Sequence, residues 1–201
     1  MSGRLFKSFS VGLFTIIPAA DPITNQCDLP IVLGTRGAFG SGEHETTVAC
    51  LELLPTIPDT SGSHVLDLGS GTGILAIAAA RLGAGEVVAL DLDPAAAVSC
   101  RENVELNGLA AKITTVCGDL AGLDVQTFDL VLANIYADIL INLADQLVAM
   151  TRAGGYLLVS GIPLQDKFDI VQRYARLGCC VRDSRIGQDF ATYLLHKGAC
   201  L

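Results

Sequence analysis

A glycine-rich segment with the pattern D-x-G-x-G-x-G, from Asp67 to Gly73, is the part of this sequence best suited to bind a small molecule. Its glycines let backbone N–H groups approach a ligand closely, and a helix that begins there favours a bound carboxylate or phosphate. A dinucleotide fingerprint, G-x-G-x-x-G, would need its third glycine at position 74, where this sequence has Ile74. The spacing therefore argues against a nicotinamide-dependent oxidoreductase.

Two aspartates follow at the ends of later apolar runs. Asp91 lies 22 residues after Gly69, where a carboxylate could accept both hydroxyl groups of a ribose. Its alternative role is to cap the next helix, but Asp93, directly before Pro94, already suits that position. Asp119 could contact an adenine amino group, or it could be an ordinary turn residue. The sequence leaves both roles of Asp119 open.

Candidate catalytic side chains lie in two further segments. The first is a glycine-rich loop that leads into a helix, and it carries His44, which could contact a cofactor or an acceptor or stay solvated. The second follows a later apolar run and begins with Asn134, whose oxygen could orient an amine. Tyr136 could line the pocket or pack on the sheet. No dedicated general base is evident, so these three residues are the catalytic candidates.

Strands and helices alternate from residue 64 onward, and this order predicts the fold class. Strands are predicted at 64–68, 86–91, 113–117, 128–133 and 156–160, and helices at 74–82, 94–107, after 133 to about 152, and near 165–177. Apolar strands separated by helices indicate a parallel sheet covered on both faces. Two final runs, 179–186 and 190–196, are too close for a crossover helix and should pair antiparallel. The prediction is a doubly wound, Rossmann-like α/β sheet of seven strands, mostly parallel with one antiparallel strand.

The first 45 residues precede this alternating pattern. The run from Val11 to Ile17 is short, contains a glycine and is rich in β-formers, which favours a strand over the apolar region of a signal peptide. No segment approaches ~20 unbroken apolar residues, so no membrane span is expected. We therefore predict a single domain over 1–201, in which 1–45 form an N-terminal strand and a loop that covers the cofactor, followed by a helix to about Leu54.

The composition limits the partners of this domain. Thirteen Lys and Arg stand against 21 Asp and Glu in 201 residues, which gives a formal charge of −8. An acidic chain has no general means of holding a phosphate backbone, so we expect no nucleic acid and favour a cationic partner. Seven cysteines without a C-x-x-C pair, and three scattered histidines, give no metal signature. The odd cysteine count suits reduced thiols in a cytoplasmic protein.

Four motifs taken together resemble those of the PrmA-type ribosomal protein methyltransferases, which are class I S-adenosylmethionine-dependent methyltransferases. They are A-F-G-x-G-x-H-x-T-T, D-x-G-x-G-x-G, D-x-D-P and N-I, in this order along the chain. The related electron-transfer-flavoprotein lysine methyltransferases look similar. The resemblance covers about residues 11–197. It implies S-adenosylmethionine as the cofactor and trimethylation of Lys and of the N-terminal amine of the eleventh protein of the large ribosomal subunit.

The resemblance and the spacing together suggest which residues contact the cofactor. The expected set is Phe39, Gly40, Thr47, Asp67, Gly69, Gly71, Gly73, Asp91, Asp119 and Asn134, with Phe39 to His44 over the methionine end. This sequence departs from the family at Thr35-Arg36-Gly37, which replaces the usual D-P-G. The chain also begins near the strand that joins the family's two domains, so we expect it to lack the N-terminal substrate-recognition domain.

The first functional hypothesis is a cytoplasmic protein lysine N-methyltransferase that acts on a basic, Lys-bearing protein, with a ribosomal protein among the candidates. Methyltransferases of adenine and of glutamine amides carry Asn-Pro-Pro-Tyr where this chain has Asn134-Ile135-Tyr136, which disfavours that substrate class. Two alternatives stay open. One is a methyltransferase that acts on a small molecule, and the other is a non-catalytic or regulatory module that binds S-adenosylmethionine.

Overall fold

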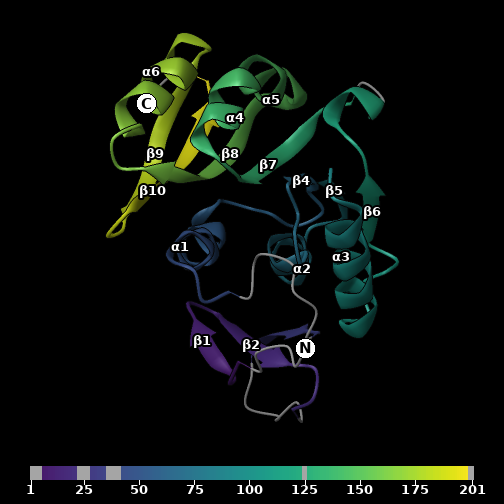
Figure 1. Ribbon diagram of the computed structural model, residues 1–201. Coiled ribbons are helices and arrows are strands. Elements are labelled where there is room, and N and C mark those ends of the chain that lie inside the picture. The colour runs from purple at the N-terminus through teal and green to yellow at the C-terminus, as the bar shows by residue number, and fades with distance from the viewer. Residues whose placement is uncertain (1–5, 22–27, 35–41, 124–125, 199–201) are drawn as a thin grey trace.

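The computed structural model describes residues 6–21, 28–34, 42–123 and 126–198, and a seven-stranded sheet forms its centre (Figure 1). The strand order is β6-β5-β4-β7-β8-β10-β9. The strands are β4 (His64–Leu68), β5 (Glu86–Asp91), β6 (Ile113–Cys117), β7 (Phe128–Asn134), β8 (Thr151–Pro163), β9 (Cys179–Ile186) and β10 (Phe190–Lys197). Strand β10 runs antiparallel to both its neighbours, while the pairs among β4 to β8 are parallel. The predicted fold class is confirmed.

Helices cover both faces of this sheet (Figure 1). On one face lie α1 (Glu45–Leu53), α2 (Ile74–Arg81) and α3 (Pro94–Leu106), and on the other lie α4 (Ala137–Asn142), α5 (Ala144–Met150) and α6 (Lys167–Arg176). Two 3-10 helices, η1 (Leu54–Thr56) and η2 (Leu120–Gly122), are the remaining helical elements of the described residues. Helix α2 is apolar on nearly all sides and is buried from Ile74 to Ala80, as expected for a helix between two layers.

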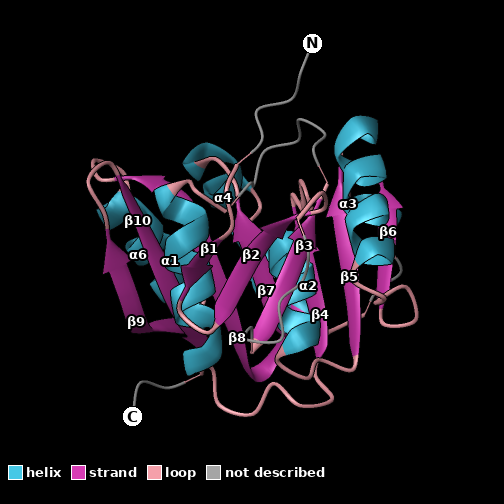
Figure 2. Ribbon diagram, turned by 90° about the horizontal axis from the view of Figure 1, so that it is seen from below, coloured by secondary structure: helices cyan, strands magenta, loops and turns pink. Residues whose placement is uncertain are grey.

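A second, smaller sheet lies outside α1 and α2 and forms a fourth layer (Figures 1 and 2). It contains β1 (Phe9–Val11), β2 (Phe14–Pro18) and β3 (Leu29–Leu33) in that order, with β1 antiparallel and β3 parallel to β2. The single strand predicted at 11–17 is wrong, because Gly12 at φ +55° turns the chain into a hairpin. Strand β3 has no predicted counterpart, since Pro30 weakens its strand signal.

The segment after β7 also differs from the prediction. In place of one helix to about residue 152 there are two, with Leu143 between them at ψ 1°, and α5 ends at Met150. Thr151 already pairs with Phe128 of β7. Strand β8 is therefore longer than the predicted 156–160, because it pairs with β7 on one side and with β10 on the other. The remaining predicted helices and strands of the main sheet agree within a few residues.

Two apolar cores lie on opposite sides of the main sheet. The core beneath α1 to α3 also contains Phe14 and Ile31 of the small sheet, so both sheets share it. The core beneath α4 to α6 is built around Phe128 and Tyr174. In the described part of the chain, no helix has the length and apolar character to cross a membrane. The cysteines at 50, 100, 117, 179 and 180 are free thiols.

Candidate active site

The glycine-rich turn joins β4 to α2 at the carboxyl edge of the main sheet. Gly69, Gly71 and Gly73 adopt φ angles of +71°, +55° and +79°, which residues with a Cβ rarely adopt. The N–H of Gly69 donates to Leu90 O at 2.8 Å, so β5 holds one side of the turn. A Cβ at Gly73 would lie 2.5 Å from the Sγ of Cys100, so α3 packs directly on the other side. The turn therefore depends on glycine for both its conformation and its packing.

Asp67, the first residue of the motif, is buried beneath the turn with 1% of its surface exposed. Its Oδ2 accepts the N–H of Ala76 at 3.0 Å in the first turn of α2. The pKa of Asp67 is raised to about 7, chiefly by burial and also by the charge of Asp91, while the hydrogen bond from Ala76 acts in the opposite direction. Asp67 therefore supports the turn from within the core.

Asp91 ends β5 beside the same turn. Its Oδ2 accepts the N–H of Gly71 at 2.8 Å, and its Oδ1 accepts the N–H of Asp93 at 3.0 Å. Asp93 caps α3 by accepting the N–H of Ala95 at 2.9 Å, so its predicted capping role is confirmed. A carboxylate has about four lone-pair positions, so Asp91 can accept further donors such as the two hydroxyls of a ribose.

Asn134 ends β7, the strand on the other side of β4. Its Nδ2 donates to the Oγ1 of Thr47 at 3.5 Å, although the two residues are 87 positions apart. Thr47 is buried in the first turn of α1. The structure thus brings together two residues that the sequence analysis assigns to the cofactor, at the sheet edge that also carries the glycine turn.

Ile135 fits between two glycines, and this close packing fixes the backbone beside Asn134. A Cβ at Gly69 would lie 2.4 Å from the Cγ2 of Ile135. A Cβ at Gly161, in β8, would lie 2.4 Å from the backbone oxygen of Ile135. Gly161 also has φ +80°. Neither position has space for a side chain, so Ile135 is closely packed between the glycine turn that follows β4 and Gly161 of β8.

A buried polar network holds the first turn of α1 against the main sheet. The hydroxyls of Ser160 and Thr192 are 2.6 Å apart, and both residues are fully buried. Ser160 also donates to the backbone oxygen of Thr46 at 3.4 Å. Ser160 of β8 is the register partner of Asn134 of β7, so the network lies one strand away from Asn134.

His44 and Glu45 attach the same turn to its surroundings. His44 is the N-cap of α1, where its Nδ1 accepts the N–H of Thr46 at 3.4 Å and lies 2.8 Å from the Thr46 hydroxyl. Glu45 accepts the N–H groups of Gln188 and Asp189 at 2.8 and 3.2 Å, which joins α1 to the β9–β10 turn. His44, for which the sequence leaves contact with a ligand and a solvated position open, therefore has a capping role at the start of α1.

The four other predicted residues have differing outcomes. Tyr136 is 77% exposed, so the alternative in which it packs on the sheet is wrong. Asp119 accepts the N–H of Gly122 at 3.1 Å and caps η2, as an ordinary turn residue would. Phe39 and Gly40 lie outside the described residues. Among the described residues, no group of three His, Cys, Asp or Glu side chains is placed to hold a metal ion.

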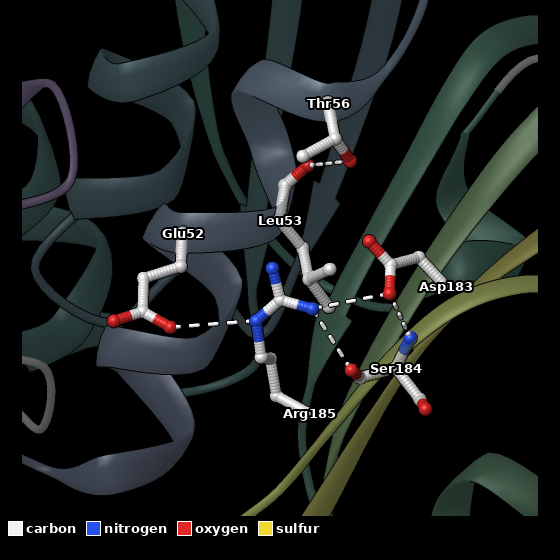
Figure 3. Close-up of polar contacts among 6 residues, drawn as sticks. All are labelled: Glu52, Leu53, Thr56, Asp183, Ser184 and Arg185. Carbon is white, nitrogen blue, oxygen red and sulfur yellow. Dashed lines mark hydrogen bonds and ion pairs between the residues drawn. The ribbon is translucent and has the colours of Figure 1, made fainter.

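A cavity of about 400 Å³ lies between α1 and the β9–β10 hairpin, next to this site. Its lining includes Thr46, Phe190 and three acidic side chains, Glu43, Glu45 and Glu52. Arg185 of β9 lies at its border and contacts Glu52 at 3.5 Å and Asp183 at 3.1 Å (Figure 3). The cavity thus lies beside the first turn of α1, and its charged lining consists of three glutamates and Arg185 among mostly uncharged residues.

Several residues that hold Asn134 and the first turn of α1 in place are not predicted from the sequence. These are Glu45, Ser160, Gly161 and Thr192, which come from α1, β8 and β10. Gly161 follows the predicted strand at 156–160, and this gives a weak signal, because a glycine at such a position often marks a close backbone approach. Single hydroxyls such as Ser160 and Thr192 have no pattern of their own, since their partners are distant in sequence.

Comparisons with known proteins show the family to which this chain is similar. The family model for ribosomal protein L11 methyltransferase (PrmA) matches residues 2–192. The ribosomal protein L11 methyltransferase of Exiguobacterium sp. is 36% identical over 185 residues, which is 92% of this chain and 59% of the relative. That of Citrifermentans bemidjiense is 49% identical over 167 residues, 78% of this chain and 53% of the relative.

A solved structure of the ribosomal protein L11 methylase from Lactobacillus delbrueckii subsp. bulgaricus superposes with a TM-score of 0.81 at 29% identity. That match covers 94% of this chain and 98% of the solved one. The chain spans little more than half the length of the curated relatives it matches. The family match nevertheless extends over nearly the whole chain, which therefore belongs to the ribosomal protein L11 methyltransferase (PrmA) family.

Proposed function

We propose that this chain transfers a methyl group from S-adenosylmethionine to a lysine of a basic protein, with ribosomal protein L11 as the first candidate. The observation that carries the proposal is the arrangement of one sheet edge. There, three adjacent strands present the glycine turn, the Asp91 carboxylate and the Asn134–Thr47 pair. The family to which the chain belongs supports the same reaction.

The polar groups at this edge of the sheet suit S-adenosylmethionine. The carboxylate of Asp91 would accept the ribose hydroxyls, and the positive-φ glycines leave the backbone of the turn open to close approach. Thr47 and Asn134 would hold the amino-acid end, together with Phe39 and Gly40. Asp119 would reach the adenine in addition to capping η2. The residues proposed to surround the cofactor are therefore those of the expected set, with Asp67 acting through the turn it supports.

The bound sulfonium would supply an activated methyl group, which an amine attacks in line while the C–S bond breaks and its electron pair stays on sulfur. The chain mainly has to hold a neutral amine about 3 Å from that methyl group, and positioning alone can contribute several kcal/mol. The oxygen of Asn134 would orient the amine. A lysine has a solution pKa of about 10.4, so desolvation at the site must favour its neutral form. His44 and Tyr136 stay candidates for contacts with the acceptor.

The acidity of the chain supports a basic acceptor. The formal charge of −8 and the carboxylates around the cavity beside α1 would attract a cationic partner. A ribosomal protein is such a partner, and a cytoplasmic location would follow from that substrate. The curated relatives extend well beyond the matched region, so the proposal concerns only the methyl transfer by the residues of this chain.

Calorimetry with S-adenosylmethionine tests the cofactor half of the proposal. We expect micromolar affinity for the wild-type chain. Asp91→Ala should weaken binding by about 100-fold, because two hydrogen bonds to a charged acceptor are lost. Asp93→Ala is the matched control, since it removes a carboxylate two residues away that caps α3, and it should leave the affinity unchanged. Absence of measurable heat with the wild-type chain would exclude the proposed cofactor.

Methyl-labelled S-adenosylmethionine tests the acceptor half. The chain is incubated with purified L11 and, separately, with a bacterial cell extract, and the label is then located by mass spectrometry. Label on a lysine of L11 or of another basic protein supports the proposal. Label on a small metabolite indicates an enzyme of a different substrate class. Cofactor binding without any transfer would instead indicate a regulatory module.

A further inference from the structure

Asn103 of α3 connects the small sheet to the glycine-rich turn. It is 2% exposed, and its side-chain amide uses both ends. The Oδ1 accepts the N–H of Gly34, the residue after β3, at 2.8 Å. The Nδ2 donates to the backbone oxygen of Thr72, in the glycine turn, at 2.8 Å. One buried side chain therefore bridges two segments that lie 38 residues apart, in different layers of the molecule.

The bond to Thr72 O restrains one end of the Thr72–Gly73 peptide in the turn. The oxygen of Thr72 and the N–H of Gly73 belong to the same planar peptide unit. The N–H of Gly73 donates to Ser70 O at 2.7 Å, so this peptide is held at both of its polar ends. Gly73 itself has little intrinsic conformational preference, because it lacks a Cβ. Asn103 therefore supplies an orientation that the glycine cannot supply.

Asn107, one helical turn further along α3, provides a natural comparison. It is 7% exposed and binds β3 in a similar way, because its amide accepts the N–H of Val32 at 3.0 Å and donates to Val32 O at 2.7 Å. Its other side-chain bonds go to Asn103 O and Arg81. Both asparagines thus tie α3 to β3, but the bond to the glycine turn belongs to Asn103.

We infer that Asn103 is a positioning residue for the cofactor site. It holds the Thr72–Gly73 peptide in the conformation to which the cofactor binds. This rests on the proposed function, because it assigns to Asn103 the task of preparing the turn that would bind S-adenosylmethionine. A turn that is already ordered does not lose conformational freedom when the ligand binds, and this raises the affinity. Asn103 does this without touching the ligand itself.

Three variants of the full chain separate this role from a general contribution to folding. Asn103→Ala removes both bonds. Asn103→Asp keeps the acceptor for Gly34 and, when ionised, loses the donor to Thr72. Asn107→Ala removes the comparable link to β3 and leaves the turn bond intact. Hydrogen exchange of peptides that cover residues 69–77, measured without cofactor, reports on the turn directly, and calorimetry with S-adenosylmethionine reports its affinity.

Both Asn103 variants should exchange faster at residues 69–77 and bind S-adenosylmethionine about 10-fold more weakly, as expected for the loss of one buried hydrogen bond. Asn107→Ala should lower the thermal midpoint but keep the affinity within about twofold. Lower pH should partly restore Asn103→Asp relative to the wild type, because a neutral carboxyl can donate to Thr72 O.

Two results would overturn the inference. One is wild-type exchange and affinity in Asn103→Asp, which would make the Thr72 bond irrelevant. The other is an equal loss of affinity in Asn107→Ala, which would show that the loss of affinity comes from a less stable α3 and not from the missing bond to Thr72. If the wild-type chain binds no S-adenosylmethionine, the proposed function fails, but the exchange of residues 69–77 in the three variants still decides whether Asn103 orders the turn.

Discussion

The two sides of the candidate site are built in different ways. The cofactor side consists of the turn from Asp67 to Gly73 and of Asp91, which follow each other within one β-α-β unit. The other side, which we name the acceptor side because Asn134 would orient the amine there in addition to holding the amino-acid end of the cofactor, joins Thr47 of α1, Asn134 of β7 and Ser160 of β8. Its hydrogen bonds span 87 and 114 residues. The first side can be recognised as a local pattern, whereas the second exists only after distant segments have packed together.

The two sides also differ in what keeps them rigid. On the cofactor side, Asp67 and Asp91 accept backbone N–H groups of α2 and of the glycine turn, and Asn103 donates to the turn, so hydrogen bonds restrain this segment. On the acceptor side, Ile135 is fixed by direct contact with Gly69 and Gly161, where no side chain fits. Substitutions on the cofactor side should therefore act mainly on ligand affinity. Substitutions on the acceptor side should act on stability or on turnover.

The largest effect is expected for Gly161→Ala. A Cβ at this position would lie 2.4 Å from backbone oxygen of Ile135, and the φ of +80° adds strain. We expect a loss of more than about 3 kcal/mol in the free energy of unfolding, because backbone cannot move aside as a flexible side chain can. Urea denaturation measures this loss.

Gly154→Ala is the matched control for that substitution. Gly154 lies in the same strand at φ +74°, but nothing lies within 4 Å of a Cβ built there. It should cost only the conformational strain of about 1–2 kcal/mol. Equal losses for the two variants would show that the contact with Ile135 has no energetic consequence and that the acceptor side is not rigid by packing.

Asn134→Ala should give the next largest effect, on turnover. Removal of the side-chain amide should lower kcat about 100-fold if the oxygen orients the amine in the transition state, and should change the affinity for S-adenosylmethionine by only a few-fold. Single-turnover kinetics and calorimetry measure the two quantities. A loss of affinity with unchanged kcat would limit Asn134 to holding the cofactor, and no residue of the acceptor side would then act on turnover.

Asp67→Asn should change how stability depends on pH. The pKa of Asp67 is raised by burial to about 7, so the folded state holds this proton more tightly than the unfolded state between about pH 4 and 7. Stability from this group is therefore present at low pH and falls as the pH rises to 7. Because Asn does not titrate, the stability difference should move in favour of Asp67→Asn by on the order of 2 kcal/mol between pH 5 and 7.

Urea denaturation at the two pH values measures that difference, with Asp93→Asn as the control for an exposed carboxylate. An Asp67→Asn variant whose stability relative to the wild type is the same at pH 5 and at pH 7 would contradict the assigned cause. The buried carboxylate would then not be a source of pH dependence on the cofactor side.

The smallest effect is expected at Tyr136. Its side chain is 77% exposed, so Tyr136→Ala should leave the free energy of unfolding within about 0.5 kcal/mol. If the ring contacts the acceptor, KM for the protein substrate should rise by a few-fold in Tyr136→Ala and less in Tyr136→Phe, which keeps the ring. Equal KM values in the wild type and both variants would remove Tyr136 from the acceptor side.

Much of the fold could be predicted because its main strands are continuous apolar runs separated by helices with clear start signals. Asp93 and Pro94 at the start of α3 show this, since capping is decided by neighbouring residues. The predictions failed where longer-range contacts decide. Gly12 allows either a continuing strand or a hairpin, and only the pairing of Phe9 with Ile16 selects the hairpin. Strand β8 is longer than predicted because it has a partner on each side.

The sequence by itself determined the glycine turn, the position of Asp91 after the next strand, and Asn134 after β7, because each depends on residue types at short spacing. Only the tertiary structure decided three hydrogen bonds between distant residues. They join Asn134 to Thr47, Ser160 to Thr192, and Asn103 to Thr72. A single Asn, Ser or Thr carries no periodic pattern, and its role depends on which distant backbone or hydroxyl group the packed layers place within hydrogen-bond distance.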